Sequence, residues 1–215
     1  MSRRQQSGFT IVEMMIATAI FSIILLIITA GVMAFSRQYM RGQTASNLQF
    51  TARQVTAQMG QDIQFGTGVE AAGPVQFKTD LTYKVGCYRI GANMYLYQIG
   101  SQVKDAQHGL IMIPNHAATC STVTLDADTL KNALDTARGA RELLSQGQRL
   151  LQLNVSSVGS AAHALDLVLA GGDDDLFTPT VTPSTTAWEQ LKCKAQTGQE
   201  FCSVTSLHTV AVERV

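Results

Sequence analysis

The stretch that decides the fold begins with Gly8-Phe-Thr-Ile-Val-Glu13 and continues without a charged residue from Met14 to Ser36. At 1.5 Å per residue, this uncharged run of 23 residues forms an α-helix roughly 34 Å long. That length is enough to cross the hydrocarbon layer of a bilayer. The sequence therefore predicts a transmembrane helix over residues 9–36.

The flanking charges orient this helix only weakly. Arg3 and Arg4 precede it, and Arg37 and Arg41 follow it. Cytoplasmic flanks of membrane helices carry an excess of Lys and Arg, so a small difference in basic residues between the two flanks gives only a weak preference for one orientation. We expect a single-pass arrangement with the N-terminus inside.

Two features distinguish this segment from an ordinary secretory signal. Such a signal has a short apolar core with a small-residue cleavage site after it, whereas Gly8 stands before a long apolar run. Glu13 lies at the start of the apolar helix, where a carboxylate costs a few kcal/mol and is functional by default. The alternative is a side chain that snorkels to the membrane edge.

The segment from Arg3 to Glu13, Arg-Arg-Gln-Gln-Ser-Gly-Phe-Thr-Ile-Val-Glu, resembles the class III signal of type IV prepilins and pseudopilins. The resemblance implies that residues 1–8 are a leader and that prepilin peptidase cuts after Gly8. It also implies methylation of the new amine, which gives an N-methylated phenylalanine at Phe9. Glu13 would act in assembly, where it could neutralise the Phe9 amine of a neighbouring subunit and set axial register.

The same resemblance implies partners and a location. The partners would be prepilin peptidase, other pilin subunits through the N-terminal helix, and the pilus assembly platform. The protein would reside in the cytoplasmic (inner) membrane and then enter an extracytoplasmic or cell-surface filament. Its large head is most similar to minor pilins of the PilW or PilJ kind.

An amphipathic continuation of the helix is expected over residues 37–65. Apolar residues recur there at steps of three and four, which defines one helical face: Leu48, Ala52, Val55, Met59 and Ile63. Gly42 marks a possible kink, and Gly66 with Gly68 marks the helix end. Residues 66–215 would then form a globular head.

Strand patterns fill most of the head from Val75 onward. The runs Leu81–Ile90 and Met94–Ile99 predict an antiparallel hairpin, and further strands are expected at Leu110–Ile113, Leu150–Val155, Ala164–Leu169 and Leu207–Val212. Asp128 offers an N-cap to an inserted helix whose apolar side extends to Leu144 and which ends near Gly147. The predicted fold class is α+β: a long N-terminal α-helix packed on an antiparallel β-sheet, with an inserted helix.

The cysteines indicate disulfides, because an even number lies in the part expected outside the cytoplasm. Four cysteines allow three connectivities, and we favour Cys87 with Cys120 and Cys193 with Cys202. The alternative is a four-cysteine zinc site, which the absence of Cys-x-x-Cys spacing disfavours. Pilins often close a C-terminal loop with a disulfide, and the second pair is similar.

Composition and motifs argue against other functions. Sixteen basic and sixteen acidic residues leave no net charge, so direct nucleic-acid binding is not expected. The four histidines, His108, His116, His163 and His208, belong to no recognised catalytic motif, so we expect no catalytic residues, no cofactor and no enzyme. Asp173, Asp174 and Asp175 are a weak calcium candidate, and a solvated turn is the simpler interpretation.

Three classes of function remain at this point. The first is a minor pilin that primes or caps a type IV pilus used for motility, adhesion or DNA uptake. The second is a pseudopilin of a type II secretion system, which carries the same kind of signal. The third is a membrane-anchored extracytoplasmic enzyme or sensor, disfavoured because the head lacks a catalytic constellation.

Overall fold

The computed structural model describes residues 9–78, 82–126, 128–159, 161–179, 190–194 and 199–214. The chain divides into two compact units, residues 1–40 and 41–215. The predicted leader, residues 1–8 with Gly8, lies outside the described residues. The domain boundaries expected from the sequence stay predictions.

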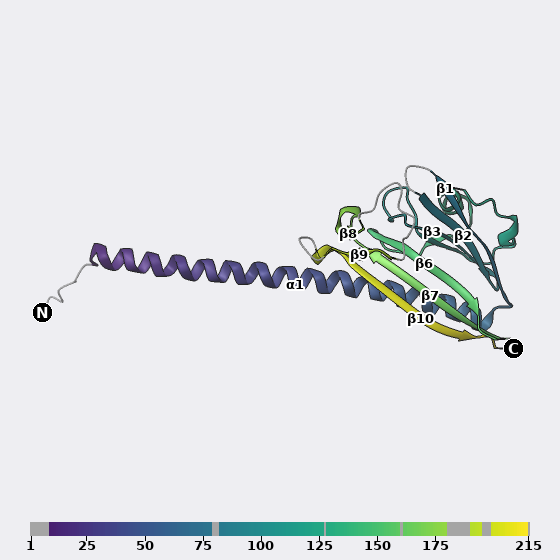
Figure 1. The fold of residues 1–215 in the computed structure, drawn as a ribbon, viewed down its shortest axis with the longest axis horizontal. Helices are drawn as coiled ribbons and strands as arrows, with labels where there is room; N and C mark the ends of the chain where they lie inside the picture. The colour runs from purple at the N-terminus through teal and green to yellow at the C-terminus, as the bar shows by residue number, and fades with distance from the viewer. Residues whose placement is uncertain are drawn as a thin grey trace, which may run out of the picture. The chain divides into compact units, whose positions relative to one another are not determined.

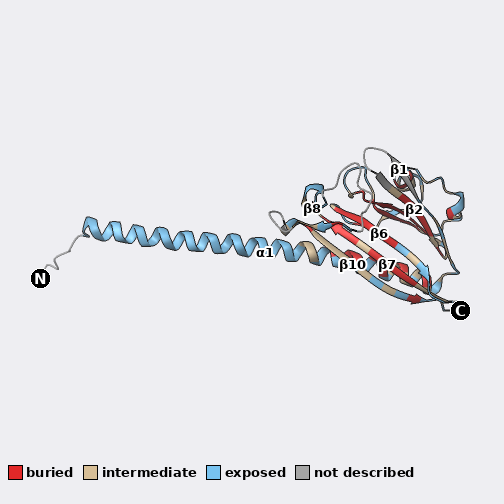
Figure 2. Cartoon of the chain, viewed as in Figure 1, coloured by how far each residue is buried: buried red, intermediate tan, exposed pale blue. Residues whose placement is uncertain are grey.

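Helix α1 (Ile11–Phe65) contains 55 residues and is helical without a break. It continues through Gly42, where the sequence suggested a kink, and it ends directly before Gly66 as expected. In the second unit one face of α1 is buried (Figure 2), and it includes all five side chains of the predicted apolar face: Leu48, Ala52, Val55, Met59 and Ile63. Burying a Leu, Val, Met or Ile side chain contributes about 2 kcal/mol, so this face holds the helix on the head.

The head is built on an eight-stranded sheet with the order β1-β2-β3-β6-β7-β10 along its main path (Figure 1), and β4 and β5 extend from β3. The strands are β1 (Val69–Lys78), β2 (Thr82–Ile90), β3 (Asn93–Ile99), β4 (Leu110–Ile113), β5 (Arg141–Glu142), β6 (Gln148–Ser157), β7 (Ala162–Gly171) and β10 (Ser203–Val212). β8 (Phe177–Thr178) and β9 (Lys192–Cys193) form a separate pair. Short 3₁₀ turns occur at Cys120–Thr122, Asp174–Leu176 and Gln199–Phe201.

Strand pairing is antiparallel except between β3 and β6, which are parallel at Ile99 and Leu150. Two long apolar clusters fill the space around this sheet. One joins the buried face of α1 to residues of β3, β6 and β7, including Tyr95 and Leu167. The fold is therefore α+β, as predicted: a long N-terminal helix followed by an antiparallel-rich head.

The predicted hairpin is confirmed from Thr82 to Ile99, and Leu81, its expected first residue, lies outside the described residues. Ile90 pairs with Asn93, so the turn is the two-residue segment Gly91-Ala92 and Asn93 already belongs to β3. Gly91 has φ of 59°, a conformation that glycine adopts without steric cost.

Strand β1 begins at Val69, six residues before the predicted start of the strand pattern at Val75. Gly73-Pro74 resembles a turn in the sequence, but here the register shifts between Ala72 and Val75, which places these two residues in a bulge. β1 is an edge strand, where proline is tolerated because no partner needs its missing N–H group.

The inserted helix is shorter than predicted. α2 spans only Thr129–Thr136, and the segment that was expected to continue it turns at Gly139 and forms β5. The predicted N-cap at Asp128 is also wrong in its mechanism, because its side chain makes no capping hydrogen bond. Instead, the Thr129 hydroxyl donates to Asp126 Oδ1 over 2.8 Å.

Candidate functional site

The first residues of α1 form a reciprocal cap. Glu13 Oε2 accepts hydrogen bonds from the Thr10 backbone N–H and the Thr10 hydroxyl, each over 2.9 Å. The Glu13 backbone N–H donates to the Thr10 hydroxyl over 3.3 Å. Such a cap satisfies helix N–H groups that have no partner within the helix. Phe9, which would become the first residue after cleavage, precedes the cap and is exposed.

The apolar part of α1 is the one helical segment within the described residues that is long and apolar enough to cross a membrane. Its side chains between Ile11 and Met40 are exposed, as expected for a segment whose partners are lipid or other chains.

Three hydroxyl groups inside this segment are satisfied by the helix itself. Thr18 donates to the Met15 carbonyl over 3.0 Å and Ser22 to the Thr18 carbonyl over 2.8 Å. Thr29 likewise donates to the Leu25 carbonyl over 2.5 Å. Because lipid offers no hydrogen bonds, these bonds leave Glu13 as the residue whose charge calls for an external partner.

Polar contacts fix the register of α1 on the head. Asp62 of α1 accepts hydrogen bonds at Oδ2 from Asn93 Nδ2, over 2.7 Å, and from the Tyr95 hydroxyl. Gln58, one turn earlier, accepts from Arg141 Nη2 over 3.0 Å. These contacts connect α1 to β3 and β5, so sliding or rotating the helix would break several of them together.

The ionisation of two core tyrosines is suppressed. Burial raises the pKa of Tyr95 above its ordinary value, and the Asp62 carboxylate raises it further. Burial also raises the pKa of Tyr97, and its neighbour Tyr88 adds to the effect. Tyr88 and Tyr97 stack with ring centroids 5.4 Å apart. These phenols therefore act as neutral donors in the head.

Contacts at the two ends of the head part of α1 fix its direction relative to β10. The Thr44 hydroxyl donates to the Glu200 carbonyl just before β10, over 3.1 Å. At the other end, the Arg214 N–H donates to the Gln64 carbonyl just after β10, over 3.0 Å. Residues 44–64 of α1 and strand β10 therefore run in the same direction.

The structure joins Cys87 to Cys120 and Cys193 to Cys202, which is the connectivity that the sequence favoured. The first bridge attaches the turn at Cys120 to the sheet beneath α2, inside the second apolar cluster. The second bridge closes the segment between β9 and β10. All four cysteines are used, so the alternative of a four-cysteine zinc site does not fit this pairing.

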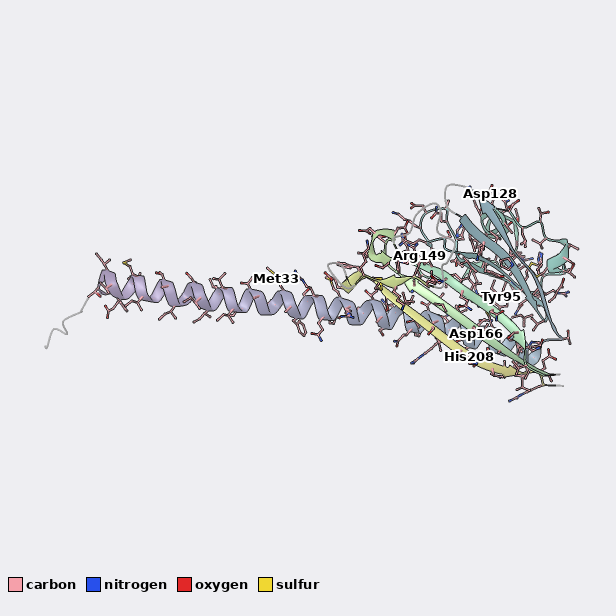
Figure 3. The ribbon with its side chains drawn as sticks, viewed as in Figure 1. Met33, Tyr95, Asp128, Arg149, Asp166 and His208 are labelled. Carbon is pink, nitrogen blue, oxygen red and sulfur yellow. A yellow bond between two sulfur atoms is a disulfide. The ribbon has the colours of Figure 1, made fainter. Side chains whose placement is uncertain are left out.

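Arg149 is a buried cation that the sequence interpretation missed (Figure 3), with 1% of its surface exposed. Its Nη2 atom lies 2.5 Å from Asp174 Oδ1 and donates to the Gly172 carbonyl over 3.0 Å. Its guanidinium also lies 5.0 Å from the centre of the Phe177 ring. Two adjacent leucines, Leu150 and Leu151, follow Arg149 and interrupt the alternation along β6, so the pattern alone gave no sign that Arg149 turns inward.

This arrangement changes the interpretation of the three adjacent acids. Asp174 is paired with Arg149, and Asp173 accepts a hydrogen bond from Gln102 over 3.3 Å. Within the described ranges, no three His, Cys, Asp or Glu side chains gather as a metal site. The acids form an exposed 3₁₀ turn held by an arginine, which supports the turn rather than the calcium candidate.

Three of the histidines lie beside carboxylates. His208 Nδ1 is 2.5 Å from Asp166 Oδ1 on the neighbouring strand (Figure 3), and His163 Nε2 is 3.1 Å from Glu213 Oε1. The hydrogen bond from His208 lowers the pKa of Asp166. These pairs connect β7 to β10 and the residue after it.

His108 lies 3.5 Å from Glu142, which is a structural carboxylate. Glu142 accepts hydrogen bonds from the backbone N–H groups of Gly109, Leu110 and Leu144. Burial raises the pKa of Glu142 despite these bonds. His116 is placed on the rim of a separate cavity next to α2, and the histidines do not converge on one site.

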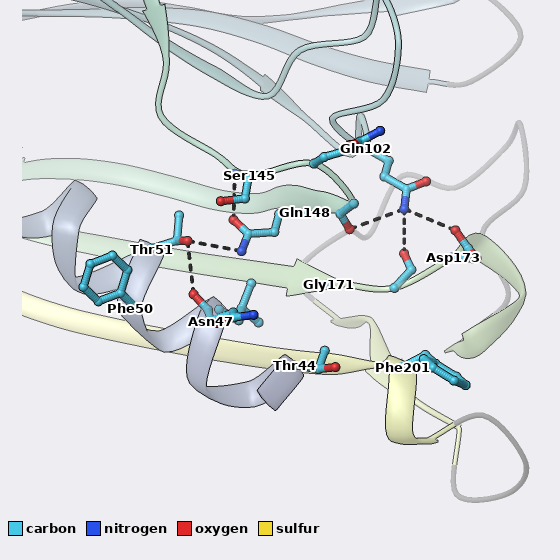
Figure 4. A pocket seen from close by; sticks show the side chains of 14 residues that line it. Thr44, Asn47, Phe50, Thr51, Gln102, Ser145, Gln148, Gly171, Asp173 and Phe201 are labelled. Carbon is cyan, nitrogen blue, oxygen red and sulfur yellow. Dashed lines mark hydrogen bonds between the residues drawn. The ribbon is translucent and has the colours of Figure 1, made fainter. Parts of the chain in front are cut away.

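The largest described cavity, of about 550 Å³, lies in the head between α1 and the ends of β6 and β7 (Figure 4). Two of its amide side chains are bonded within the head. Gln148 Nε2 donates to the Thr51 hydroxyl over 3.2 Å, and Gln102 Nε2 contacts the carbonyls of Gly147 and Gly172. The cavity shows no pair of groups arranged for acid–base chemistry.

Comparison with known proteins supports the interpretation of the N-terminal segment. Residues 3–29 match the family described as the prokaryotic N-terminal methylation motif. No curated protein and no solved structure matches the chain.

The motif and the fold together define the class of the protein. The chain carries the class III signal of type IV pilins and pseudopilins, ahead of a long apolar helix and an α+β head of the pilin kind. The signal is the kind that prepilin peptidase processes in pilin-like proteins, and the apolar helix that follows it has the length and composition of a membrane anchor.

Proposed function

We propose that this chain is a minor pilin that is inserted in the cytoplasmic membrane with its N-terminus inside and joins or primes a type IV pilus. The observation that carries the proposal is the class III signal followed by an apolar segment, residues 9–36, in which Glu13 is the one charged side chain. Its partners would be the pilus assembly platform and the N-terminal helices of other pilin subunits.

The contacts of Glu13 support a mechanism for assembly. Within the described residues, the bonds of this carboxylate to Thr10 use Oε2 and no hydrogen bond uses Oε1. Cleavage after Gly8 would create an amine at Phe9 and would leave the Thr10 cap in place. We infer that Thr10 orients the carboxylate and that Oε1 receives the Phe9 amine of a neighbouring subunit. Such a charge pair sets register more than it adds net stability.

The proposed role is structural and not enzymatic. The perturbed tyrosines, Glu142 and Arg149 each have a structural partner in the head, and two amide side chains of the largest described cavity, Gln102 and Gln148, are bonded within the head. A pilin subunit needs no catalytic group.

Mass spectrometry of sheared surface filaments tests the proposal. We expect this chain in the filament fraction at a small fraction of the copy number of the main subunit. Recovery in equal numbers would make it a major pilin. Recovery only in the membrane of cells that assemble filaments would contradict the filament role. A pseudopilin would instead be required for secretion and would leave surface filaments unaffected when deleted.

A further inference from the structure

The largest described cavity lies entirely within the second unit, residues 41–215. Its walls come from α1, from the turn before β6 and from the turn after β7, and the 3₁₀ turn before β10 adds Phe201 (Figure 4). Its volume of about 550 Å³ lies within the range of about 300–1,000 Å³ that is typical of small-molecule sites. The cavity is therefore large enough for a ligand.

Gly171 keeps one wall of this cavity free of side chains. It is the last residue of β7 and pairs with Gln148 on one side and Ser203 on the other. Among the described residues, a Cβ atom at this position would meet only Leu48 Cδ1, at 3.9 Å. The backbone of Gly171 is not in the left-handed region, so a larger residue could stand there without strain. The open space therefore depends on the missing side chain and not on the backbone geometry.

The polar side chains of the cavity leave neutral hydrogen-bonding capacity for a ligand. Gln148 is fixed, because its Oε1 atom accepts from the Ser145 N–H over 3.0 Å and its Nε2 atom donates to Thr51. The side chains of Asn47 and Gln146 are exposed and make no hydrogen bond within the described part of the chain. The bond drawn at Asn47 in Figure 4 uses its backbone carbonyl. A carboxamide both donates and accepts, as a hydroxyl group does.

The charge of the lining disfavours an anionic ligand. Asp173 is the one ionisable residue among the described residues that line the cavity. Gln102 Nε2 holds its Oδ1 atom at 3.3 Å, and within the described residues its Oδ2 atom accepts no hydrogen bond. Arg149 is buried and does not line the cavity. An anion would therefore meet a like charge without a counter-charge, whereas a ligand hydroxyl could donate a charge-assisted hydrogen bond to Asp173.

Two exposed phenylalanines lie at the two ends of the cavity in Figure 4. Phe50 of α1 is 70% exposed, and Phe201 is 53% exposed. The face of an aromatic ring carries partial negative charge and attracts the positive edge of C–H groups. The lining thus combines neutral polar groups with flat apolar faces.

We propose that this cavity binds a short, uncharged oligosaccharide. A pyranose ring carries hydroxyl groups around its rim and C–H groups on its faces. The rim would meet the amides of Asn47 and Gln146 and the Oδ2 atom of Asp173, and a C–H face would pack on Phe50. The inference concerns the head and does not rest on the filament role, so either proposal can fail without the other.

Saturation-transfer NMR tests this proposal with the full chain in a polyoxyethylene detergent, because a sugar-headed detergent would compete for the cavity. The probes are neutral trisaccharides of glucose, galactose, mannose and N-acetylglucosamine, and trigalacturonic acid is the anionic control. We expect saturation to pass from the protein to the ring protons of at least one neutral probe. The anionic control should receive little, because Asp173 repels it.

Gly171→Val is the variant that fills the cavity. Valine suits a strand, and its side chain would occupy the open space beside Leu48. Ser206→Val is its matched control, since it places the same side chain at an exposed position of β10 that does not line the cavity. We expect Gly171→Val to abolish the transfer and Ser206→Val to retain it, with circular dichroism confirming that both variants fold.

A second pair of variants tests the aromatic contact. Phe50→Ala should weaken the dissociation constant, measured by titration of the probe, about fivefold. Phe65→Ala is the control, because Phe65 lies on the same helix, is 72% exposed and does not line the cavity. Its dissociation constant should stay at the wild-type value.

Absence of transfer to all the neutral probes, or equal transfer to trigalacturonic acid, would overturn the proposal. Wild-type binding by a folded Gly171→Val, or equal losses in Phe50→Ala and Phe65→Ala, would do the same. Self-association that Gly171→Val abolishes, with no saccharide bound by the wild type, would assign the cavity to a second copy of the chain instead.

Discussion

Tyr95 on β3 donates its hydroxyl hydrogen to the carboxylate of Asp62 on α1, and this bond joins the helix to the centre of the sheet. Tyr95 is fully buried, and Asp62 also accepts a hydrogen bond from Asn93 at the start of the same strand. The helix that carries the membrane signal is thereby held at one register on the head.

Replacing Tyr95 with phenylalanine should lower the free energy of unfolding by about 2 kcal/mol, because the charged acceptor loses its buried donor. Asp62→Asn is the matched variant. Its amide oxygen can still accept both hydrogen bonds, so this substitution should lower the free energy of unfolding by less than Tyr95→Phe does. Urea unfolding of the two variants and the wild type, followed by circular dichroism, measures the difference. A stability unchanged by Tyr95→Phe would show that the bond does not hold the helix.

The same bond predicts a loss of stability at high pH. Burial and Asp62 raise the pKa of Tyr95 in the folded chain, whereas the phenol of the unfolded chain ionises near its ordinary value of about 10. The neutral form therefore favours folding, and its contribution is fully present below pH 10 or so and is lost as the pH rises above it. Tyr95→Phe should reduce this pH dependence, measured as unfolding free energy against pH. A steeper dependence in the variant would contradict the assignment.

The pair of Arg149 and Asp174 should respond asymmetrically to substitution. Arg149 is buried, whereas the Asp174 side chain is 49% exposed. Asp174→Ala leaves a buried cation without a counter-charge and should cost about 2 kcal/mol, below the range for a fully buried pair. Adding Arg149→Met should restore part of that loss, because a thioether needs no counter-charge. Thermal unfolding of the single and double variants measures this recovery of stability. A double variant less stable than Asp174→Ala would refute the explanation.

The disulfides should differ in their contribution to stability. Cys87 and Cys120 are separated by 33 residues and Cys193 and Cys202 by 9. Loop-closure entropy gives about 4 kcal/mol for the longer loop and about 3 for the shorter one. Each pair is replaced by alanines, and chemical unfolding of the two variants measures which disulfide contributes more to stability. The intact chain should also show no reactive thiol after denaturation without reductant, and four titratable thiols would contradict the pairing.

The fold was predictable from the sequence where one period dominates over a long stretch. The apolar steps of three and four from Leu48 to Ile63 identified the buried face of α1, and alternating Tyr, Val and Ile residues identified β2 and β3. The errors occurred where tertiary context overrides local pattern. Gly73-Pro74 is tolerated in β1 because it lies in a bulge on an edge, and Gly139 ends a pattern that otherwise favours helix beyond Thr136.

The roles of polar residues inside the head could not be predicted from the local sequence, for a related reason. Arg149 and Asp62 are recognisable only through their partners, which come from segments distant in the sequence. At the N-terminus the reverse holds. The signal that contains Gly8, Phe9 and Glu13 is local to a few residues, so its resemblance to the class III signal was enough to predict processing and assembly.

Processing after Gly8 is the next prediction. Gly8→Val should leave the full-length precursor in the membrane, because a branched side chain replaces the small residue before the scissile bond. Ser7→Ala is the control and should be processed normally. Intact-mass analysis of the membrane protein should give an N-terminus at Phe9 with one added methyl group in the wild type. A mature chain that starts at Met1 or beyond residue 30 would contradict the account.

The central claim is that the Glu13 carboxylate acts between subunits and not in the folding of the head. Glu13→Ala removes the charge from the apolar helix and leaves residues 41–215 untouched, so membrane levels should be maintained. Glu13→Gln keeps the shape and hydrogen-bonding capacity without the charge, and Glu13→Asp keeps the charge on a shorter stem. Thr10→Val is a further control, because it removes the hydroxyl bond to the cap but keeps the carboxylate.

The most direct measurement is the recovery of each variant in the filament fraction relative to its level in the membrane. The account predicts that Glu13→Ala and Glu13→Gln lose most of their recovery and that Glu13→Asp retains part of it. The recovery of Thr10→Val should fall less than that of Glu13→Ala or Glu13→Gln. Wild-type recovery of Glu13→Ala and Glu13→Gln would contradict the role of this carboxylate between subunits.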